Sequence, residues 1–241
     1  VVIVASVRAL KMHGGAFRLP PGKKPPKEEI ERENVEAVRA GCANLAKHIE
    51  TGRLFGVPVV VAINKFATDT EAEITAVREE ALRAGAFACE VATVHAEGGP
   101  GGVDLANAVL SASEQPSDFH FLYELDWPIR RKIETIATKV YGADGVDFLP
   151  EAERKIDQYT ALGLDKLPIC MAKTHLSLTH DPTLLGRPTG FRVPIRDVQP
   201  SVGAGFLYPL LGEMRTMPGL GTRPAYMNVD VDEDGRVMGL F

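Results

Sequence analysis

Cysteine is scarce in this sequence, and its spacing excludes two common ways of stabilising a protein fold. The three cysteines, Cys42, Cys89 and Cys170, are odd in number, lie far apart and form no C-x-x-C pair. The pattern therefore excludes a disulfide framework and contains no cysteine-based zinc or redox motif. Such a chain is typical of a reducing compartment, so we expect a cytoplasmic protein.

Long hydrophobic runs and an excess of positive charge are also missing. No apolar stretch approaches the roughly 20 residues that cross a bilayer. The chain carries 27 Lys and Arg against 32 Asp and Glu, which gives a formal net charge of −5. This balance gives no electrostatic reason to bind nucleic acid or an anionic membrane. We therefore expect small molecules as binding partners, with neither nucleic acid nor a membrane among them.

An initiator methionine, a charged leader and the common phosphate-binding motif are also lacking. The chain opens on Val1–Ala5, an apolar run that predicts a strand, with no initiator methionine and no charged leader. We therefore expect a chain cut within a domain, with part of any site lying upstream. The phosphate-binding pattern G-x-x-x-x-G-K-[ST] is also missing from the sequence. Any phosphate cradle must then come from elsewhere, or be absent.

Residues 1–112 alternate between apolar strands and amphipathic helices. Alternation of this kind predicts an α/β fold, in which right-handed crossovers place helices against a parallel sheet. The predicted strands are Val1–Ala5, Val57–Ile63 and Ala88–Thr93, and the predicted helices are Lys27–Glu50, Thr70–Arg83 and Val103–Ser113. The proline-rich segment Phe17–Lys27 predicts an exposed loop.

Residues 113–241 follow a different pattern, and we expect a smaller α+β domain there. Two helices, about Pro128–Tyr141 and Pro150–Leu162, precede short strands joined by Gly and Pro turns. The strand candidates are Leu167–Ala172, Gly190–Val198, Phe206–Leu211 and Tyr226–Val231. Asp230–Gly235 imitates a calcium-binding loop, but the twelfth position is Phe241 rather than Glu, so we expect an Asp-Gly hairpin turn.

Polar side chains and glycines follow each predicted strand of residues 1–112 at the point where it ends. They are Lys11 and His13 after the first strand, Asn64, Phe66 and Asp69 after the second, and His95, Glu97, Gly98 and Gly99 after the third. The carboxyl ends of parallel strands share one edge of a sheet, where open α/β sheets bind ligands. An aromatic ring there can stack on a flat ligand. The sequence thus predicts a site for a nucleotide or another heteroaromatic molecule.

The post-strand groups also have ordinary structural interpretations. Lys11 and His13, followed by two glycines, suit contact with phosphate or a carboxylate, or simply two solvated side chains at a tight turn. Asp69 can meet a ligand or begin a helix. For Glu71 and Glu73 we favour helix capping, because both Thr68–Glu71 and Thr70–Glu73 have the capping-box spacing.

Two histidine-containing segments are weaker indications. By default, His95 is an ordinary loop residue. His175 and His180 lie in a polar run that begins at Lys173, after a predicted strand, and they suit one wall of a site. Their spacing does not indicate a metal centre, and no cysteine joins them.

Ordered motifs along the chain resemble those of the formate–tetrahydrofolate ligase family. They are Val2–Gly15, Asn64–Glu73, Ile136–Gly145, Leu167–Thr174, Gly186–Phe191, Thr216–Leu220 and Asp230–Phe241. The resemblance covers essentially the whole chain, in order. The stretch Lys173–Leu178 looks closer to the synthetase domain of eukaryotic trifunctional folate enzymes than to bacterial stand-alone ligases.

The resemblance implies a two-step reaction on a fold similar to that of the P-loop nucleotide hydrolases. ATP phosphorylates formate to formyl phosphate, and N10 of tetrahydrofolate then attacks the formyl carbon and releases phosphate. The resemblance also implies ATP with Mg²⁺, activation by a monovalent cation such as potassium, and a homo-oligomeric full-length enzyme. For that full-length protein a mitochondrial location stays open beside the cytoplasmic one.

Site residues follow from the same resemblance. Only the second half of the family's enzyme is matched: part of the nucleotide domain (1–112) and the C-terminal domain (113–241), with the phosphate-binding loop expected upstream. Phe66 matches the aromatic stacking residue, and His95 stands where relatives usually carry Trp. Asn64, Asp69, Glu97, Gly98 and Gly99 are expected to line the pocket for the adenine or pteridine ring. Lys11 and His13 are the expected catalytic side chains on the acyl-phosphate side, and no metal ligand is assigned.

Two rival interpretations remain open from the sequence. One is another P-loop-like, ATP-dependent carboxylate ligase, which would share the pattern of residues 1–112 but would not explain the C-terminal motifs. The other is a non-catalytic module that binds folate or a nucleotide. The missing phosphate loop and the histidine at the tryptophan position favour that module modestly.

Overall fold

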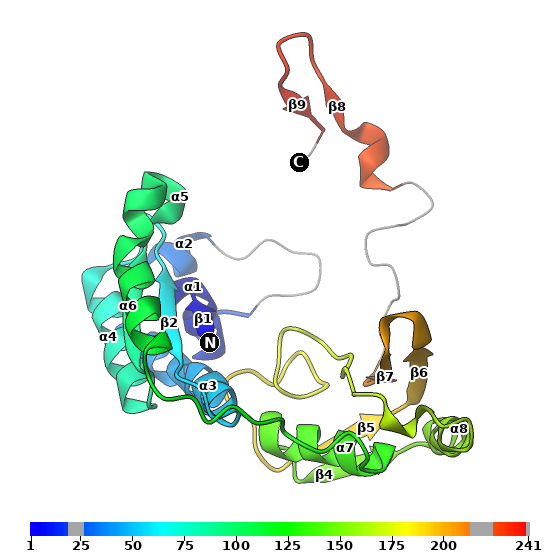
Figure 1. Cartoon of the computed structure of the whole chain (residues 1–241). Helices are drawn as coiled ribbons and strands as arrows, with labels where there is room; N and C mark the ends of the chain where they lie inside the picture. The colour runs from blue at the N-terminus through cyan, green and yellow to red at the C-terminus, as the bar shows by residue number, and fades with distance from the viewer. Residues whose placement is uncertain (19–26, 213–223, 240–241) are drawn as a thin grey trace.

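A parallel sheet forms the centre of the first part of the chain. The computed structural model describes residues 1–18, 27–212 and 224–239 (Figure 1). Its first sheet has the order β1-β2-β3, with β1 at Val2–Ala5, β2 at Val60–Asn64 and β3 at Ala88–Ala92. All neighbours run parallel, with Val2 opposite Val60 and Val60 opposite Ala88. The predicted α/β fold with a parallel sheet is thus confirmed for this part.

Alternate residues of β2 are buried against helices on opposite faces of this sheet. Val61 and Ile63 join a hydrophobic core with α1 (Val7–His13), α3 (Val35–Arg53) and α4 (Glu71–Arg83). Val60 and Ala62 are also buried but point to the other face, where α6 (Val103–Ser113) packs on β2 and β3. This two-sided burial explains why β2 appears in the sequence as a continuous apolar run.

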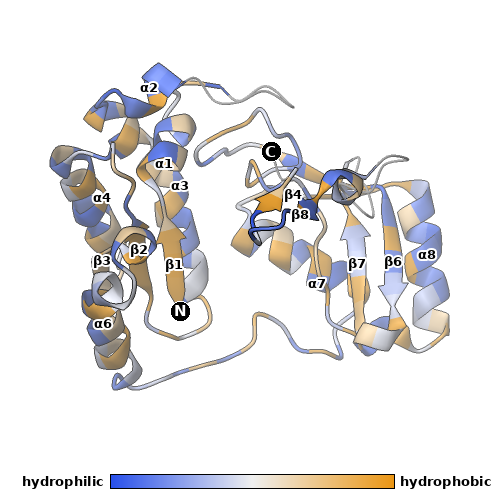
Figure 2. Ribbon diagram, turned by 90° about the horizontal axis from the view of Figure 1, so that it is seen from above, coloured by the Kyte–Doolittle hydropathy of each residue, from blue (hydrophilic) through white to orange (hydrophobic). Residues whose placement is uncertain are grey.

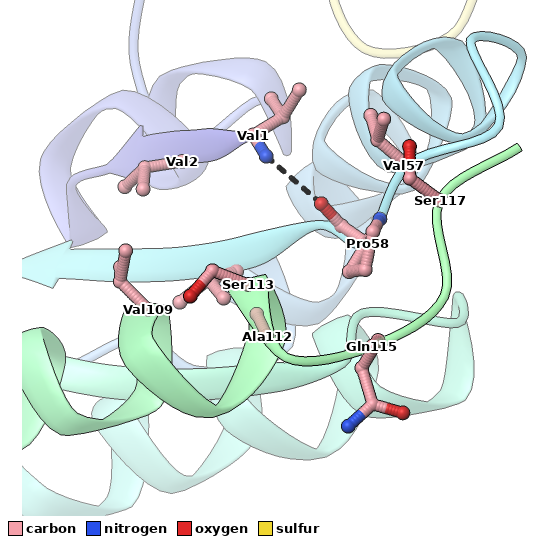
Figure 3. Close-up of a pocket in the computed structure, with 10 residues that line it drawn as sticks. Val1, Val2, Val57, Pro58, Val109, Ala112, Ser113, Gln115 and Ser117 are labelled. Atoms are coloured by element: carbon pink, nitrogen blue, oxygen red, sulfur yellow. Dashed lines mark hydrogen bonds between the residues drawn. The ribbon is translucent and has the colours of Figure 1, made fainter. Parts of the chain in front are cut away.

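Helix α6 leaves the face of β1 largely open. On the α6 side of the sheet, Val4 is 70% exposed and Val2 is also exposed. Strand β1 is nevertheless hydrophobic, as the hydropathy colouring shows (Figure 2). A hollow of about 270 Å³ lies there, at the amino ends of β1 and β2, between Val2, Val60 and Val109 of α6 (Figure 3). This hollow is at the edge of the sheet opposite to the predicted ligand edge.

Two expectations for the segment between β1 and β2 were wrong. The segment after β1 is a helix, α1, rather than a loop, because Val7 and Leu10 pack into the core one turn apart. The predicted helix Lys27–Glu50 is two helices, α2 (Lys27–Glu31) and α3, and α3 begins at an N-cap, Asn34, whose side chain accepts the N–H of Ala37. Most of the predicted loop at 17–27 lies outside the described residues.

Glycines bring α1 and α3 unusually close together. A Cβ on Gly41 would lie 1.9 Å from the carbonyl oxygen of Leu10, and one on Gly14 would lie 1.8 Å from that of Ala37. No larger residue fits at either position without moving a backbone. The tight contact holds α1, and with it the start of the ligand edge, against the longest helix of this part of the chain.

The second part of the chain has its own hydrophobic core. Strands β4 (Gly145–Phe148) and β5 (Arg192–Ile195) pair in parallel, whereas β6 (Asp197–Ser201) and β7 (Phe206–Leu210) pair antiparallel. Helix α7 (Ile129–Thr135), which continues as a π-helix over Ile136–Val140, and helix α8 (Pro150–Ala161) pack against them. The two cores are separate, and α6 ends at Ser113, but a domain boundary between 112 and 113 stays a prediction.

Several predicted strands of the second part differ in the structure. Gly190–Val198 is broken at Arg196 into β5 and β6, which pair with different partners. Leu167–Ala172 makes only single bridges to β7, from Ile169 and Ala172. A 3₁₀-helix, Ala225–Asn228, takes the first half of Tyr226–Val231, and β8 (Asp230–Val231) and β9 (Val237–Met238) then form the expected hairpin. Residues 216–220, one of the motifs above, lie outside the described residues.

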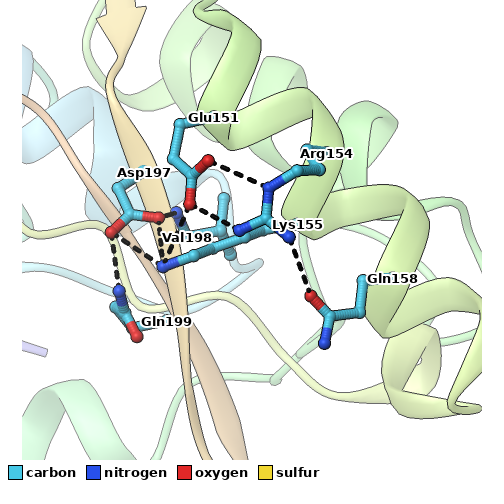
Figure 4. A network of polar contacts seen from close by, with 7 residues as sticks. All are labelled: Glu151, Arg154, Lys155, Gln158, Asp197, Val198 and Gln199. Atoms are coloured by element: carbon cyan, nitrogen blue, oxygen red, sulfur yellow. Dashed lines mark hydrogen bonds and ion pairs between the residues drawn. The ribbon is translucent and has the colours of Figure 1, made fainter.

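Polar networks tie the helices to the strands and the two parts to each other. Lys155 of α8 pairs with Asp197 of β6 at 2.8 Å, within a network that also includes the Arg154–Glu151 pair (Figure 4). Between the two parts, Asn44 of α3 donates to the carbonyl of Gly186 at 2.9 Å, and Arg187 pairs with Glu50 at 2.7 Å. Within the described residues, no helix is both long and apolar enough to cross a membrane.

Candidate functional site

The carboxyl end of β2 carries a tight, carboxylate-stabilised turn. Asn64 is the last residue of the strand, and the turn of Phe66 to Asp69 follows it. The Asp69 carboxylate accepts the backbone N–H of Phe66 at 2.8 Å, and the Asp69 N–H donates back to the carbonyl of Phe66 at 3.0 Å. Burial of Asp69 raises the pKa of its carboxyl, against the opposing effect of the Phe66 N–H. Asp69 therefore shapes the turn that presents Phe66.

An arginine that sequence reasoning missed lies on the ring of Phe66. The guanidinium carbon of Arg8 lies 3.5 Å from the centroid of the Phe66 ring, a close cation–π contact. The Arg8 Nε is buried and has no hydrogen-bond partner among the described residues. Arg8 belongs to the first turn of α1, directly after β1. Its place directly after a predicted strand is the signal for it in the sequence, but the residues that follow predict a loop rather than a helix.

Lys11 is buried at the base of this edge. Its ammonium group pairs with Glu73 at 2.7 Å, and both side chains are 0% exposed. The same nitrogen donates to the carbonyls of Ile30 and Arg32, at 2.8 and 2.9 Å, so its three hydrogens all have acceptors. In this arrangement Lys11 positions the helices around the site, and its contact with an acyl phosphate stays a prediction.

Glu73 combines the expected capping role with this ion pair. The Thr70 side chain accepts the N–H of Glu73, and the Glu73 carboxylate accepts the N–H of Thr70, which is the predicted capping box. The other carboxylate oxygen also accepts the N–H of Asn34, at 2.8 Å. Glu73 thus joins α4, α1 and the start of α3. Glu71, by contrast, pairs with Lys65 at the surface.

The end of β3 supplies an open, exposed turn. His95 and Glu97 lie in a short helix, α5 (Val94–Glu97), instead of the expected loop, and both are exposed. Glu97 accepts the hydroxyl of Thr93 at 2.6 Å. Gly98 has φ +66°, and a Cβ on Gly98 or Gly99 would meet nothing within 4 Å. Since Asn64 of β2 pairs with Ala92 of β3, the structure brings this turn and Phe66 to neighbouring strand ends.

His13 does not belong to this edge. It is the last residue of α1, at the end remote from β1, and its Nδ1 accepts the N–H of Gly186 at 3.0 Å. Burial lowers the pKa of His13, and the neighbouring His48 lowers it further. Its assignment to the acyl-phosphate side stays a prediction, but the structure places His13 beside the second part of the chain.

Taken together, the fold and the strand ends define a class of protein. This is an α/β protein whose parallel sheet ends in aromatic, arginine and carboxylate groups, at the edge where open α/β sheets bind ligands. Its sequence matches the family described as formate–tetrahydrofolate ligase over residues 1–241. The chain belongs to the formate–tetrahydrofolate ligase family.

Individual relatives agree with this assignment. The chain is 58% identical to a formate–tetrahydrofolate ligase of Desulforamulus reducens, over all of its own length and 42% of the relative's. It is 56% identical to the cytoplasmic C-1-tetrahydrofolate synthase of Saccharomyces cerevisiae and 51% identical to the mitochondrial one, in each case over 25% of the relative. The chain thus spans less than half of these relatives. The identities do not separate bacterial from eukaryotic relatives, and the eukaryotic ones include cytoplasmic and mitochondrial forms.

Proposed function

We propose that this chain carries the ring-binding part of an ATP-dependent formate–tetrahydrofolate ligase. The reaction yields 10-formyltetrahydrofolate, ADP and phosphate through formyl phosphate, on a domain similar to the P-loop nucleotide hydrolases. Phe66 is the observation that carries the proposal, because its turn is fixed by Asp69 at the carboxyl end of the central strand. The family match over the whole chain supports it.

Each group at the strand ends has a part in holding a planar ligand. The Phe66 ring stacks on the adenine or pteridine, and Arg8 backs the ring or extends the stack over the ligand. Asn64 and Asp69 meet polar atoms at the edge of the heterocycle. The open turn at Gly98 and Gly99 lets a ligand approach the backbone closely. His95 closes the stack, though an imidazole offers less stacking area than the indole that the family resemblance implies at this position.

The phosphoryl-transfer machinery is proposed to lie outside these 241 residues. The sequence contains no G-x-x-x-x-G-K-[ST] loop, and the ammonium group of Lys11 is fully engaged by Glu73 and two carbonyls. Within the described ranges no group of three or more His, Cys, Asp or Glu is placed to hold a metal ion. We assign none of these residues to the Mg²⁺ that the family implies, and no step here depends on it.

Equilibrium binding tests the ring-binding role. We expect tetrahydrofolate to bind the chain in a calorimetric titration, and Phe66→Ala to weaken binding by roughly 3- to 10-fold, the usual worth of an aromatic stack. Phe87→Ala is the matched control. Phe87 is an exposed phenylalanine directly before β3, at the opposite edge of the sheet. Equal affinity of both variants for tetrahydrofolate would contradict the proposal.

A non-catalytic module that binds folate is the second candidate, and the saturated hydrogen bonding of Lys11 favours it. Titration with ATP separates the two functions, since a module for folate alone binds tetrahydrofolate but not the nucleotide. We also expect the isolated chain not to turn over. Production of 10-formyltetrahydrofolate from ATP, formate and tetrahydrofolate by the 241-residue chain would overturn that expectation.

A further inference from the structure

A small cavity remote from the strand ends is lined by basic side chains from three parts of the chain. It has a volume of about 270 Å³ and lies where α1 and α3 meet the second part of the chain. His13 comes from the end of α1, His48 from α3, and Lys173 and His175 from the segment after the bridges to β7. No Asp or Glu occurs among the described residues that line it. We call it the basic cavity.

Lys173 is a partly buried cation without a carboxylate partner in the described part of the chain. Its ammonium group donates to the carbonyls of Thr174, at 2.8 Å, and Ser177. It also lies 5.1 Å from the centroid of the Tyr141 ring. Burial alone lowers its pKa to about 8, and no acidic group opposes that shift. A bound anion would supply the missing negative charge.

The histidines add hydrogen-bond donors beside the charge of Lys173. Because the Nδ1 of His13 accepts the N–H of Gly186, we assign the proton of the neutral ring to Nε2, which is then a donor. Burial lowers the pKa of His48, and the charges of Lys173 and Lys47 lower it further. Lys173, which lines the same cavity, lowers this pKa more than Lys47 does.

The wall of the basic cavity is already fixed in place. Asn44 donates to the carbonyl of Gly186, while the N–H of the same glycine donates to His13. The two parts of the chain are therefore joined around the cavity by hydrogen bonds that need no ligand. Because these contacts already fix His13 beside the cavity, an anion can bind there without the cost of ordering that side chain.

We propose that the basic cavity binds a phosphate group, either as inorganic phosphate or as a small phosphate monoester. Phosphate carries about −1.5 to −2 charges at neutral pH and has oxygens on every side. Lys173 and the histidine N–H groups approach the cavity from three segments, which suits such an ion better than a planar monocarboxylate. The site is separate from the strand ends and does not depend on the proposed ligase function.

Thermal unfolding and calorimetric titration of the chain with sodium phosphate test this site. At matched ionic strength, we expect phosphate to raise the melting temperature more than chloride or acetate does. Lys173→Met should weaken phosphate binding by roughly 10-fold or more, the usual worth of a hydrogen bond to a charged group. Titration with glycerol phosphate separates the two sources, since a monoester that binds more tightly than phosphate identifies an organic ligand.

Two variants serve as controls, and a third repeats the test at His48. Lys139→Met removes the same charge from an exposed position close to Tyr141, and Phe66→Ala alters only the strand-end site; both should leave phosphate affinity within twofold. His48→Gln changes a side chain that lines the cavity but does not belong to the hydrophobic core, so it should weaken phosphate binding severalfold without disturbing the fold. The proposal is overturned if phosphate binding survives Lys173→Met and His48→Gln, is lost in Phe66→Ala, or is matched by acetate.

Discussion

Lys11 and Glu73 form an ion pair that is completely shielded from solvent, 62 positions apart in the sequence. Their nitrogen–oxygen distance is 2.7 Å, and neither side chain is exposed at all. All the hydrogens of the ammonium group have acceptors, and the carboxylate also accepts backbone N–H groups of Thr70 and Asn34. The pair fixes α1 against α4 directly beneath the ligand edge.

Loss of the charge on Glu73 should destabilise the fold strongly. Glu73→Gln leaves the Lys11 charge buried without a counter-ion, and the expected loss is about 3–5 kcal/mol in the free energy of unfolding. Urea unfolding measures this change. Glu71→Gln is the matched control, because Glu71 is 80% exposed and pairs with Lys65 at the surface, so it should change stability by less than about 1 kcal/mol. Similar losses in the two variants would contradict the prediction.

The close contact of α1 with α3 predicts a sharp intolerance at Gly41. Gly41→Ala places a methyl group 1.9 Å from the carbonyl oxygen of Leu10, so the helices must separate. We expect a loss of about 1–3 kcal/mol, the usual cost of overpacking, in denaturant unfolding. A methyl group at Gly203 meets nothing within 4 Å, and Gly203→Ala should be nearly neutral. A Gly41→Ala variant as stable as Gly203→Ala would show that α1 and α3 are not held this closely.

The cysteines should differ in reactivity. Burial raises the pKa of Cys42 and of Cys89 to about 12, so neither forms the reactive thiolate at neutral pH, whereas Cys170 is exposed. A chromogenic disulfide reagent should therefore modify one thiol per folded chain and all three in denaturant. Cys170→Ser should abolish the fast native reaction. Rapid modification that persists in that variant would contradict the burial of the other two.

Asp197 should make the second part of the chain sensitive to acid. Burial raises the pKa of its carboxyl, but hydrogen bonds from Lys155, Gln199 and Val198 outweigh this and hold it below the ordinary 3.8 (Figure 4). An acid with a lowered folded pKa stabilises the protein above the unfolded value, and the contribution disappears as pH falls through the folded one. Asp197→Asn should therefore cost about 1–3 kcal/mol at pH 7, with the difference shrinking below about pH 4.

The same pH series has an internal comparison. Glu151→Gln removes a neighbouring carboxylate of the network that is half exposed, and it should cost less than about 1 kcal/mol at pH 7. Denaturant unfolding curves at several pH values give the loss of unfolding free energy for Asp197→Asn and for Glu151→Gln. If the loss of unfolding free energy in Asp197→Asn stays constant from neutral to strongly acidic pH, it does not come from the lowered pKa of the Asp197 carboxyl.

The sequence predicted those features that depend on local pattern. The strands of the first sheet, the Thr70–Glu73 capping box and the Asp-Gly hairpin all follow from residues close together in the chain. The glycines after His13 predict a loop in this segment. Helix α1 forms instead because Val7 and Leu10 pack against α3, and a tertiary contact of this kind is not visible in the local sequence. The break at Arg196 likewise depends on the partners that β5 and β6 find elsewhere.

The candidate site was predictable only in outline. The order of the strands placed Asn64, Phe66, Asp69 and the turn at Gly98 on one edge, and the structure agrees with that placement. The contact of Arg8 with Phe66 and the burial of Lys11 depend on side chains from different strand ends, which spacing along the chain does not encode. The roles of all these residues in binding and chemistry stay predictions.

Helix α1 carries residues of both candidate sites. Arg8 in its first turn lies on Phe66, His13 at its end lines the basic cavity, and Lys11 is fixed between them. From Val7 to His13 the helix rises by about 9 Å. Any movement of α1 on binding at one site would therefore reach side chains of both sites. By thermodynamic reciprocity, a ring ligand that changes phosphate affinity must have its own affinity changed by the same factor.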